Sequence, residues 1–164
     1  MVGPQTLTTF LSYNPTGLSD QKCDWLNSLS EICEATYVSV QEHFRKSKTI
    51  DRYFKTQFPN YHSYVIPGFR EEGQDRGRPK AGIAQLSRAS VGVTKELIMC
   101  RNERIQAQIL NFESSKILRI NAYFPTDPDT VVYNSDDLQP VLSEIERVMD
   151  CFENTDVLIA ADMN

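Results

Sequence analysis

The fold of this chain is decided by residues 7–42, whose sequence is LTTFLSYNPTGLSDQKCDWLNSLSEICEATYVSVQE. Residues 7–13 are rich in β-branched and aromatic side chains and end at the turn sequence NPTG, so they predict a strand. Residues 19–34 predict an amphipathic helix, and residues 37–40 predict a second strand. The order of strand, helix and strand indicates a βαβ-like unit.

Two amphipathic helices are predicted, the first capped by Ser19 or Asp20 and the second over residues 137–152. The apolar face of the first consists of Trp25, Leu26, Leu29, Ile32 and Cys33, and that of the second of Leu138, Val141, Leu142, Ile145, Val148, Met149 and Phe152. A shorter helix is predicted over residues 51–57. Helices with one apolar face pack against something else, so we expect them on the outside of a sheet.

The remaining strands are predicted at residues 63–66, 83–86, 104–112, 116–124 and 157–161, with a long loop over residues 67–80. Within 104–112, apolar residues alternate with Gln106 and Gln108, which is typical of a half-buried strand. The chain is therefore predicted to be an α/β protein with helices outside and several antiparallel hairpins inside.

Composition favours one globular domain. The chain has 164 residues, of which 40% are hydrophobic and 24% charged, so a packed core is expected and disorder is not. No apolar run approaches the ~20 residues of a membrane helix, and the N-terminus lacks the pattern of a secretion signal. Four cysteines without a C-x-x-C pair are expected to be small buried hydrophobes in a reducing compartment. We therefore expect an intracellular location and no membrane partner.

The net charge of −5 is unevenly distributed. Residues 43–88 contain ten Lys and Arg against four Asp and Glu, a balance of +6, and the other residues contain seven against eighteen, a balance of −11. Aromatic residues are interleaved with the basic ones in this block. Such a block can supply a surface for nucleic acid, although a solvated loop and helix face is the simpler interpretation.

Polar residues follow directly on three predicted strands: Asn14, Glu42, and the pair Asp162 and Asn164. Ligands of α/β sheets bind at the carboxyl ends of strands, where loops converge. Two carboxylates and two amides there suit Mg²⁺, which polarises phosphoryl oxygens. Helix caps and turns are the alternative role for such residues. No P-loop, G-x-S-x-G or H-E-x-x-H motif competes, and His43 is expected to have a surface or packing role.

Five segments occur in this order: SYNPTGL (12–18), SVQE (39–42), GRPKAGIA (77–84), INAYFP (120–125) and VLIAADMN (157–164). Together they resemble the endonuclease/exonuclease/phosphatase superfamily, which includes deoxyribonucleases and abasic-site endonucleases. More narrowly, they are similar to the endonuclease domain of non-LTR retrotransposons. The resemblance implies a four-layer α/β sandwich, with two mixed, largely antiparallel sheets packed face to face and helices outside.

The resemblance also implies roles for individual residues. Glu42 and Asn14 would form the site for Mg²⁺ (or Mn²⁺), with Glu42 as the principal ligand and Asn14 beside it orienting metal-bound water or phosphate. Tyr123 would hydrogen-bond the scissile phosphate, Asp162 would orient or deprotonate the attacking water, and Asn164 would contact the phosphate or the nucleophile. In the basic block, Arg76, Arg78 and Lys80 would contact the nucleic-acid backbone.

The chain departs from the family pattern at Thr16, where many relatives carry an acid, and at Thr126, where abasic-site enzymes carry an asparagine. Both departures disfavour a function in abasic-site repair and are tolerable in a retrotransposon-type nuclease. The family's later motifs, an aspartate and a terminal Ser-Asp-His, are not in residues 1–164. The resemblance thus implies a single incomplete domain, the N-terminal two-thirds of such a nuclease. We expect this piece alone to be poorly soluble and without nuclease activity.

The function implied is a metal-dependent phosphodiesterase that nicks DNA for a reverse transcriptase, which would be part of the same full-length, nuclear protein. Two alternatives stay open. One is a phosphatase of the same superfamily that acts on inositol or lipid phosphates, and the other is a catalytically silent remnant that binds nucleic acid. The long basic, glycine-containing loop fits an extended polyanion better than a small head group.

Overall fold

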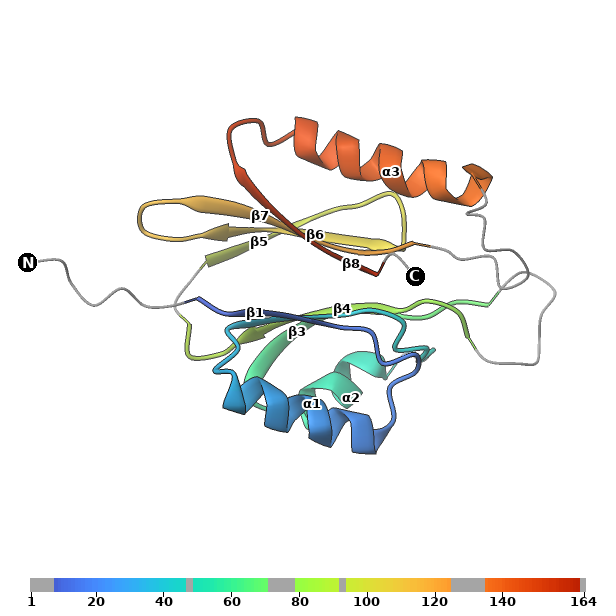
Figure 1. Ribbon diagram of the computed structural model, residues 1–164, viewed down its shortest axis with the longest axis vertical. Coiled ribbons are helices and arrows are strands. Elements are labelled where there is room, and N and C mark those ends of the chain that lie inside the picture. Colours follow the sequence, from blue (N-terminus) through green and yellow to red (C-terminus); the bar gives the residue numbers. More distant parts are fainter. Residues whose placement is uncertain (1–7, 47–48, 71–78, 92–93, 125–134, 163–164) are drawn as a thin grey trace, which may run out of the picture.

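Two four-stranded sheets pack face to face, with helices on their outer faces, in the computed structural model of the chain (Figure 1). The structure describes residues 8–46, 49–70, 79–91, 94–124 and 135–162. Its elements are β1 (Phe10–Tyr13), α1 (Asp20–Ile32), β2 (Tyr37–Val40), α2 (Ile50–Gln57), β3 (Tyr61–Ile66), β4 (Ile83–Arg88), β5 (Thr94–Ile98), β6 (Ile105–Asn111), β7 (Lys116–Tyr123), α3 (Ser135–Asp150) and β8 (Asp156–Asp162).

The first sheet has the strand order β1-β2-β4-β3. Strands β1 and β2 are parallel and α1 connects them, which confirms the predicted βαβ unit. The predicted cap is also confirmed, since the Ser19 side chain accepts a hydrogen bond of 3.3 Å from the backbone N–H of Lys22. Strand β4 is antiparallel to both of its neighbours, so its first residue lies at the edge where β2 and β3 end.

The second sheet has the order β5-β6-β7-β8. Helix α3 connects β7 to β8 in the sequence. These two strands are parallel neighbours, and α3 covers the outer face of the sheet (Figure 1). Strand β5 is missing from the sequence-based prediction. It is an edge strand whose Leu97 is 60% exposed, so its pairing with β6 produces no apolar pattern in the sequence. No helix in the described ranges is long and apolar enough to cross a membrane.

The apolar cores lie outside the sheets, between each sheet and its helices. The first contains residues of β2 and β4 packed against Leu26 of α1 and Phe54 of α2. The second contains the apolar faces of β6 and β7 packed against Val141, Ile145 and Val148 of α3. Each sheet is therefore stabilised by helix packing on one face, and its other face meets the opposite sheet.

The layer between the sheets is rich in buried polar side chains. Its buried side chains include Ser39, Gln41, Gln85, Ser87, Gln106, Gln108, Arg119 and Asn121. The side chain of Asn121 connects the sheets: it accepts a hydrogen bond of 2.7 Å from Nε2 of Gln41 and donates to the Ala84 and Val40 carbonyls, at 3.0 and 3.3 Å. Gln85 and Gln106 form further bonds across the layer, each to a backbone carbonyl of the opposite sheet.

Arg119 is the most unusual member of this layer, because this charged residue is only 1% exposed. It donates to the Ser39 hydroxyl at 2.8 Å and to the Leu86 carbonyl at 3.3 Å, and lies 5.4 Å from the centre of the Tyr37 ring. Within the described part of the chain it pairs with no carboxylate. Burial lowers the pKa of Arg119 to about 9.

Several burial expectations are wrong. Gln106 and Gln108 do not face solvent, because the polar face of β6 is covered by the other sheet. In α1 the buried residues are Cys23, Leu26 and Ser30, whereas Trp25 and Ile32 are 51% and 80% exposed. Helix α3 is closer to prediction, although Leu142 and Met149 at the margin of its apolar face are 37% and 38% exposed.

The cysteines also differ from expectation. All four are free, but only Cys23 is buried, Cys100 is half-buried, and Cys33 and Cys151 are exposed. The exposed pair lie just beyond the C-terminal ends of α1 and α3, where the helices no longer cover a sheet.

We predict that Asn121→Ala destabilises the protein by about 2–4 kcal/mol, because it removes the acceptor for Gln41 and the donor for two carbonyls in a buried layer. Urea-induced unfolding measures the change. Asn60→Ala, at an exposed position, is the matched control. Equal effects of the two substitutions would show that the inter-sheet hydrogen bonds do not stabilise the fold.

Candidate active site

Four of the predicted site residues meet at one edge of the sandwich. Asn14 follows β1, Glu42 follows β2 by two residues, and Tyr123 and Asp162 are the last residues of β7 and β8. In each sheet the two strands are parallel neighbours, so they end at the same edge. Because the sheets pack face to face, each sheet brings two of these side chains to the same place.

Asn14 links the two sheets at this edge. Its Nδ2 donates a hydrogen bond of 2.9 Å to Oε2 of Glu42 and a second bond to Oδ2 of Asp162. Its Oδ1 accepts a hydrogen bond of 2.8 Å from the backbone N–H of Thr16. The amide nitrogen therefore lies between two carboxylates from different sheets, and the amide oxygen stabilises the turn that follows β1.

Glu42 is held by a constrained backbone. Its φ is +49°, a conformation that costs an L-residue energy unless its surroundings enforce it. Its carbonyl accepts a hydrogen bond of 2.7 Å from the N–H of Gly17, and the N–H of the next residue, His43, donates to the Gly82 carbonyl at 3.1 Å. The side chain is only 9% exposed. These contacts direct the carboxylate of Glu42 toward Asn14.

The His43 side chain is buried and packs against the backbone around this turn, which agrees with the packing role expected for it. Its Nδ1 accepts from the N–H of Arg45 and its Nε2 bonds to the Ile66 carbonyl, both at 3.1 Å, so the proton is on Nε2. Burial lowers the pKa of His43 to about 4, which makes the ring neutral near pH 7. Gly82, with a φ of +88°, lies directly against this ring.

Tyr123 points into the same cluster. Burial and the nearby charge of Glu42 raise the pKa of Tyr123 well above its usual value, and its hydroxyl hydrogen-bonds to Glu42. The phenol therefore stays protonated and can donate. Arg104, the residue just before β6, places its guanidinium carbon 5.6 Å from the centre of the Tyr123 ring and 5.3 Å from that of Phe69.

Of the other predicted site residues, the structure describes only some. Lys80 is described, exposed, and paired through its backbone with Phe69 on the segment that joins β3 to β4. Arg76, Arg78, Asn164 and the Thr126 position lie outside the described residues. Sequence reasoning missed Arg104 as a site residue, because only its proximity to Tyr123 and Phe69 marks it.

The donor set fits a hard divalent cation. Glu42 and Asp162 supply two carboxylates, and Mg²⁺ in proteins is commonly bound by one or two carboxylates while it keeps several waters. Among the described residues, no group of three His, Cys, Asp or Glu side chains lies close enough together to hold a metal ion. Glu42, buried and hydrogen-bonded to Asn14 and Tyr123, is the best-oriented candidate ligand.

Comparison with known proteins identifies the fold. No protein-family model matches the sequence, and no curated protein is significantly similar to it. The AP endonuclease LMAP from Leishmania major matches with a TM-score of 0.72 at 16% identity, over 95% of this chain and 55% of that chain. The endonuclease domain of TRAS1, a telomere-specific non-LTR retrotransposon, matches with a TM-score of 0.61 at 13% identity, over 96% and 60%.

An endonuclease/exonuclease/phosphatase family protein from Bacteroides thetaiotaomicron matches with a TM-score of 0.60 at 14% identity, over 94% of this chain and 62% of that chain. This chain has the endonuclease/exonuclease/phosphatase fold. The implied sandwich of two sheets with outer helices is thereby confirmed. The chain spans 55–62% of the length of these three endonuclease/exonuclease/phosphatase structures.

We predict that Gly82→Ala displaces the Glu42 turn and destabilises the protein by about 2–4 kcal/mol. An added Cβ would lie 2.5 Å from Cε1 of His43, whose buried ring is fixed by two hydrogen bonds, and alanine disfavours the positive φ. Thermal unfolding measures the loss. Gly17→Ala, at another glycine with positive φ, measures the cost of backbone conformation; if both variants lose the same stability, the contact with His43 is unimportant.

Proposed function

We propose that this chain is the catalytic portion of a metal-dependent phosphodiesterase that nicks the DNA backbone. The observation that carries the proposal is the cluster of Asn14, Glu42 and Asp162, with the protonated Tyr123 beside it, at the edge where four strands end. Such an edge is where α/β sheets bind ligands. The matched structures with this fold include an AP endonuclease and a retrotransposon endonuclease, which supports a phosphodiester substrate.

Each side chain of the cluster has its own role in the proposed hydrolysis. Glu42 would hold Mg²⁺ or Mn²⁺, which when bound would polarise a phosphoryl oxygen. Tyr123, kept protonated by burial and by Glu42, donates a hydrogen bond from its hydroxyl to a non-bridging oxygen of the scissile phosphate. Asp162 accepts the proton of the attacking water, whose oxygen forms the new P–O bond as the ester bond opposite it breaks, and the leaving ester oxygen takes a proton from solvent water. Asn164 would contact the phosphate or the nucleophile.

Two further groups assist this arrangement. Asn14 keeps the carboxylates of Glu42 and Asp162 in place by donating to both, which reduces their mutual repulsion. Arg104, beside Tyr123, adds a positive charge on the side of the site where the phosphate would lie. Preorganised donors and charges of this kind stabilise the transition state because they need no rearrangement during the reaction.

Our more specific proposal is an endonuclease that nicks target DNA for a reverse transcriptase in the same full-length, nuclear protein. The matched fold of the TRAS1 endonuclease domain supports it. We also propose that residues 1–164 alone are inactive. A phosphatase for inositol or lipid phosphates and a silent nucleic-acid-binding remnant are the competing functions. Assays that offer both supercoiled plasmid and inositol polyphosphates separate the three.

We predict that Glu42→Gln, in the full-length protein that contains this sequence, lowers the rate of Mg²⁺-dependent plasmid nicking by about 100-fold or more. The substitution removes the charge that attracts a hard cation but hardly changes side-chain volume. The measurement is conversion of supercoiled to open-circular DNA. Circular dichroism should be unchanged, and Glu146→Gln, an exposed glutamate of α3, should nick normally. Near-normal nicking by Glu42→Gln would refute the metal assignment.

We predict that neutralising Arg76, Arg78 and Lys80 together weakens DNA binding and makes it less dependent on salt. Each phosphate contact releases condensed counterion, so losing three contacts lowers the slope of log affinity against log salt by about 2–3. Fluorescence anisotropy of labelled DNA over a range of salt concentrations measures this slope. An unchanged slope would mean that these three side chains face solvent in the complex.

A further inference from the structure

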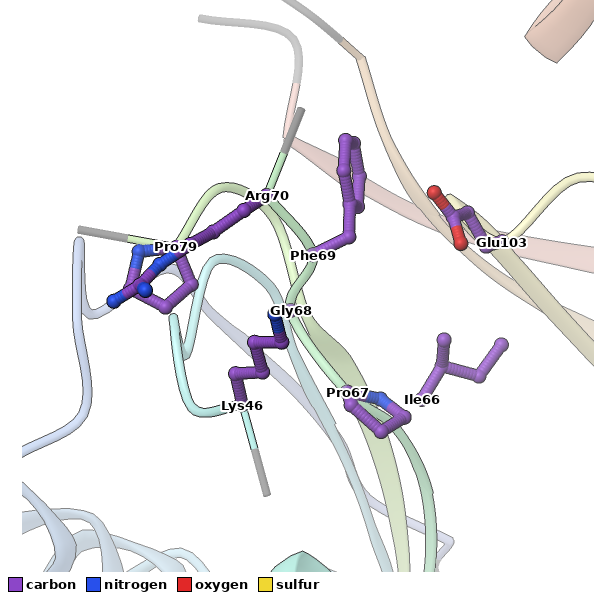
Figure 2. A pocket seen from close by; sticks show the side chains of 8 residues that line it. All are labelled: Lys46, Ile66, Pro67, Gly68, Phe69, Arg70, Pro79 and Glu103. Carbon is purple, nitrogen blue, oxygen red and sulfur yellow. The ribbon is translucent and has the colours of Figure 1, made fainter. Parts of the chain in front are cut away.

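Figure 2 shows a pocket that lies where β3 ends, with the side chains that line it. It has a volume of about 720 Å³, which is within the range of small-molecule sites. Its lining residues are Lys46, Ile66, Pro67, Gly68, Phe69, Arg70, Pro79 and Glu103. They come from the segment after β2, the crossing from β3 to β4, and the turn before β6, so they lie at the same edge of the sandwich as Glu42 and Tyr123.

Arg104 joins the pocket to the site. Its guanidinium carbon lies 5.3 Å from the centre of the Phe69 ring in the pocket and 5.6 Å from that of Tyr123 in the site. The backbone reinforces this link, since the N–H of Tyr123 donates to the Arg104 carbonyl at 2.9 Å. A ligand whose phosphate reached Tyr123 would therefore have its neighbouring group next to Phe69.

The pocket has two sides of different chemical character. Figure 2 shows the Arg70 side chain running toward Pro79 on one side of Phe69, whereas the Glu103 carboxylate lies on the other side. Phe69 is half-buried and is held by paired backbone hydrogen bonds of 2.8 and 3.0 Å with Lys80. The pocket thus offers an aromatic ring on a fixed backbone, with cations toward one side and a hydrogen-bond acceptor toward the other.

Lys46 also lines a second hollow of about 440 Å³, together with Arg45, Tyr53 and Pro79. There the Arg45 guanidinium stacks on the Tyr53 ring, with its central carbon 3.6 Å from the ring centre. Because Lys46 and Pro79 line both hollows, these two residues separate them, as a backbone phosphate lies between two nucleosides. Alternating cations and aromatic rings are typical of surfaces that bind single strands.

We propose that the Phe69 pocket holds one unstacked nucleobase adjacent to the scissile phosphate, so that the protein prefers a strand with unpaired nucleotides to a fully paired duplex. The base would stack on Phe69, its phosphate would contact Lys46 or Arg70, and its amino or imino N–H would donate to Glu103. This inference rests on the proposed phosphodiesterase function and specifies the form of its DNA substrate.

Glu103 favours a base over a second phosphate in this pocket. A carboxylate repels phosphate oxygens but accepts hydrogen bonds from the N–H groups on the edge of a base. Phe69 also favours a base as the ligand, because every base has a face that can stack on an aromatic ring. A paired base has both faces and its pairing edge occupied, so only an unpaired nucleotide can use both residues.

The experiment measures binding, by fluorescence anisotropy without divalent cations, to four oligonucleotides of equal length: a single strand, a duplex, a duplex with one unpaired nucleotide, and an abasic strand. We expect the single strand and the interrupted duplex to bind more tightly than the duplex and the abasic strand. Phe69→Ala should weaken binding of the first two by about tenfold and change the others by less than about twofold. Phe69→Trp should retain the preference.

Controls separate the base pocket from other effects. Phe112→Ala removes an aromatic ring at the opposite edge of β6 and should change nothing. If Phe69→Ala unfolds, Phe69→Leu keeps the apolar volume and should show the same selective loss. Equal losses on all four oligonucleotides, or no loss, would overturn the proposal. Failure of the proposed function is distinct, since it would appear as no DNA nicking by the full-length protein, whatever the binding preference.

Discussion

The hydrogen bonds of Asn121 across the buried layer are the interaction on which the rest of the structure depends. A polar group removed from water must find a partner, and a carboxamide has two donors and an acceptor to satisfy. Asn121 on β7 finds its partners in Val40 of β2, in Gln41 directly after that strand, and in Ala84 of β4. These directional bonds fix the position of one sheet on the other more narrowly than apolar contacts would. That position brings Asn14 and Glu42 of one sheet to Tyr123 and Asp162 of the other.

The local structure was largely predictable, and the layer between the sheets was not. The period of apolar residues in α1 and α3 and the turn sequence after β1 have local causes, so the βαβ unit and most strands follow from them. Strand β5 has no such pattern, because pairing with β6 alone holds it. Gln106 and Gln108 show the deeper difficulty: alternation identifies two faces of a strand but does not tell whether the polar face meets water or another polar sheet.

The candidate site was also only partly predictable from the sequence. Polar residues directly after strands are visible in the sequence, and the resemblance to nucleases selects Tyr123 among many buried aromatics. The contact of Asn14 with both carboxylates, by contrast, joins residues 148 positions apart and requires both sheets. Arg104 and Phe69 belong to no motif, and their importance arises from the distances between their side chains. Residues that act through neighbours from other elements are therefore the ones that sequence patterns miss.

The polar inter-sheet layer also shapes how stability changes with temperature. Exposure of apolar surface on unfolding raises the heat capacity, whereas exposure of polar surface lowers it. In this fold the sheet-to-sheet contact, commonly the apolar centre of a sandwich, exposes many amides, hydroxyls and the Arg119 guanidinium on unfolding, alongside apolar surface such as the Tyr37 ring. The heat-capacity increment per residue should be small, and the curve of unfolding free energy against temperature correspondingly flat. A sandwich of this kind loses little of its stability on cooling, because less of that stability comes from the hydrophobic effect at the interface between its sheets.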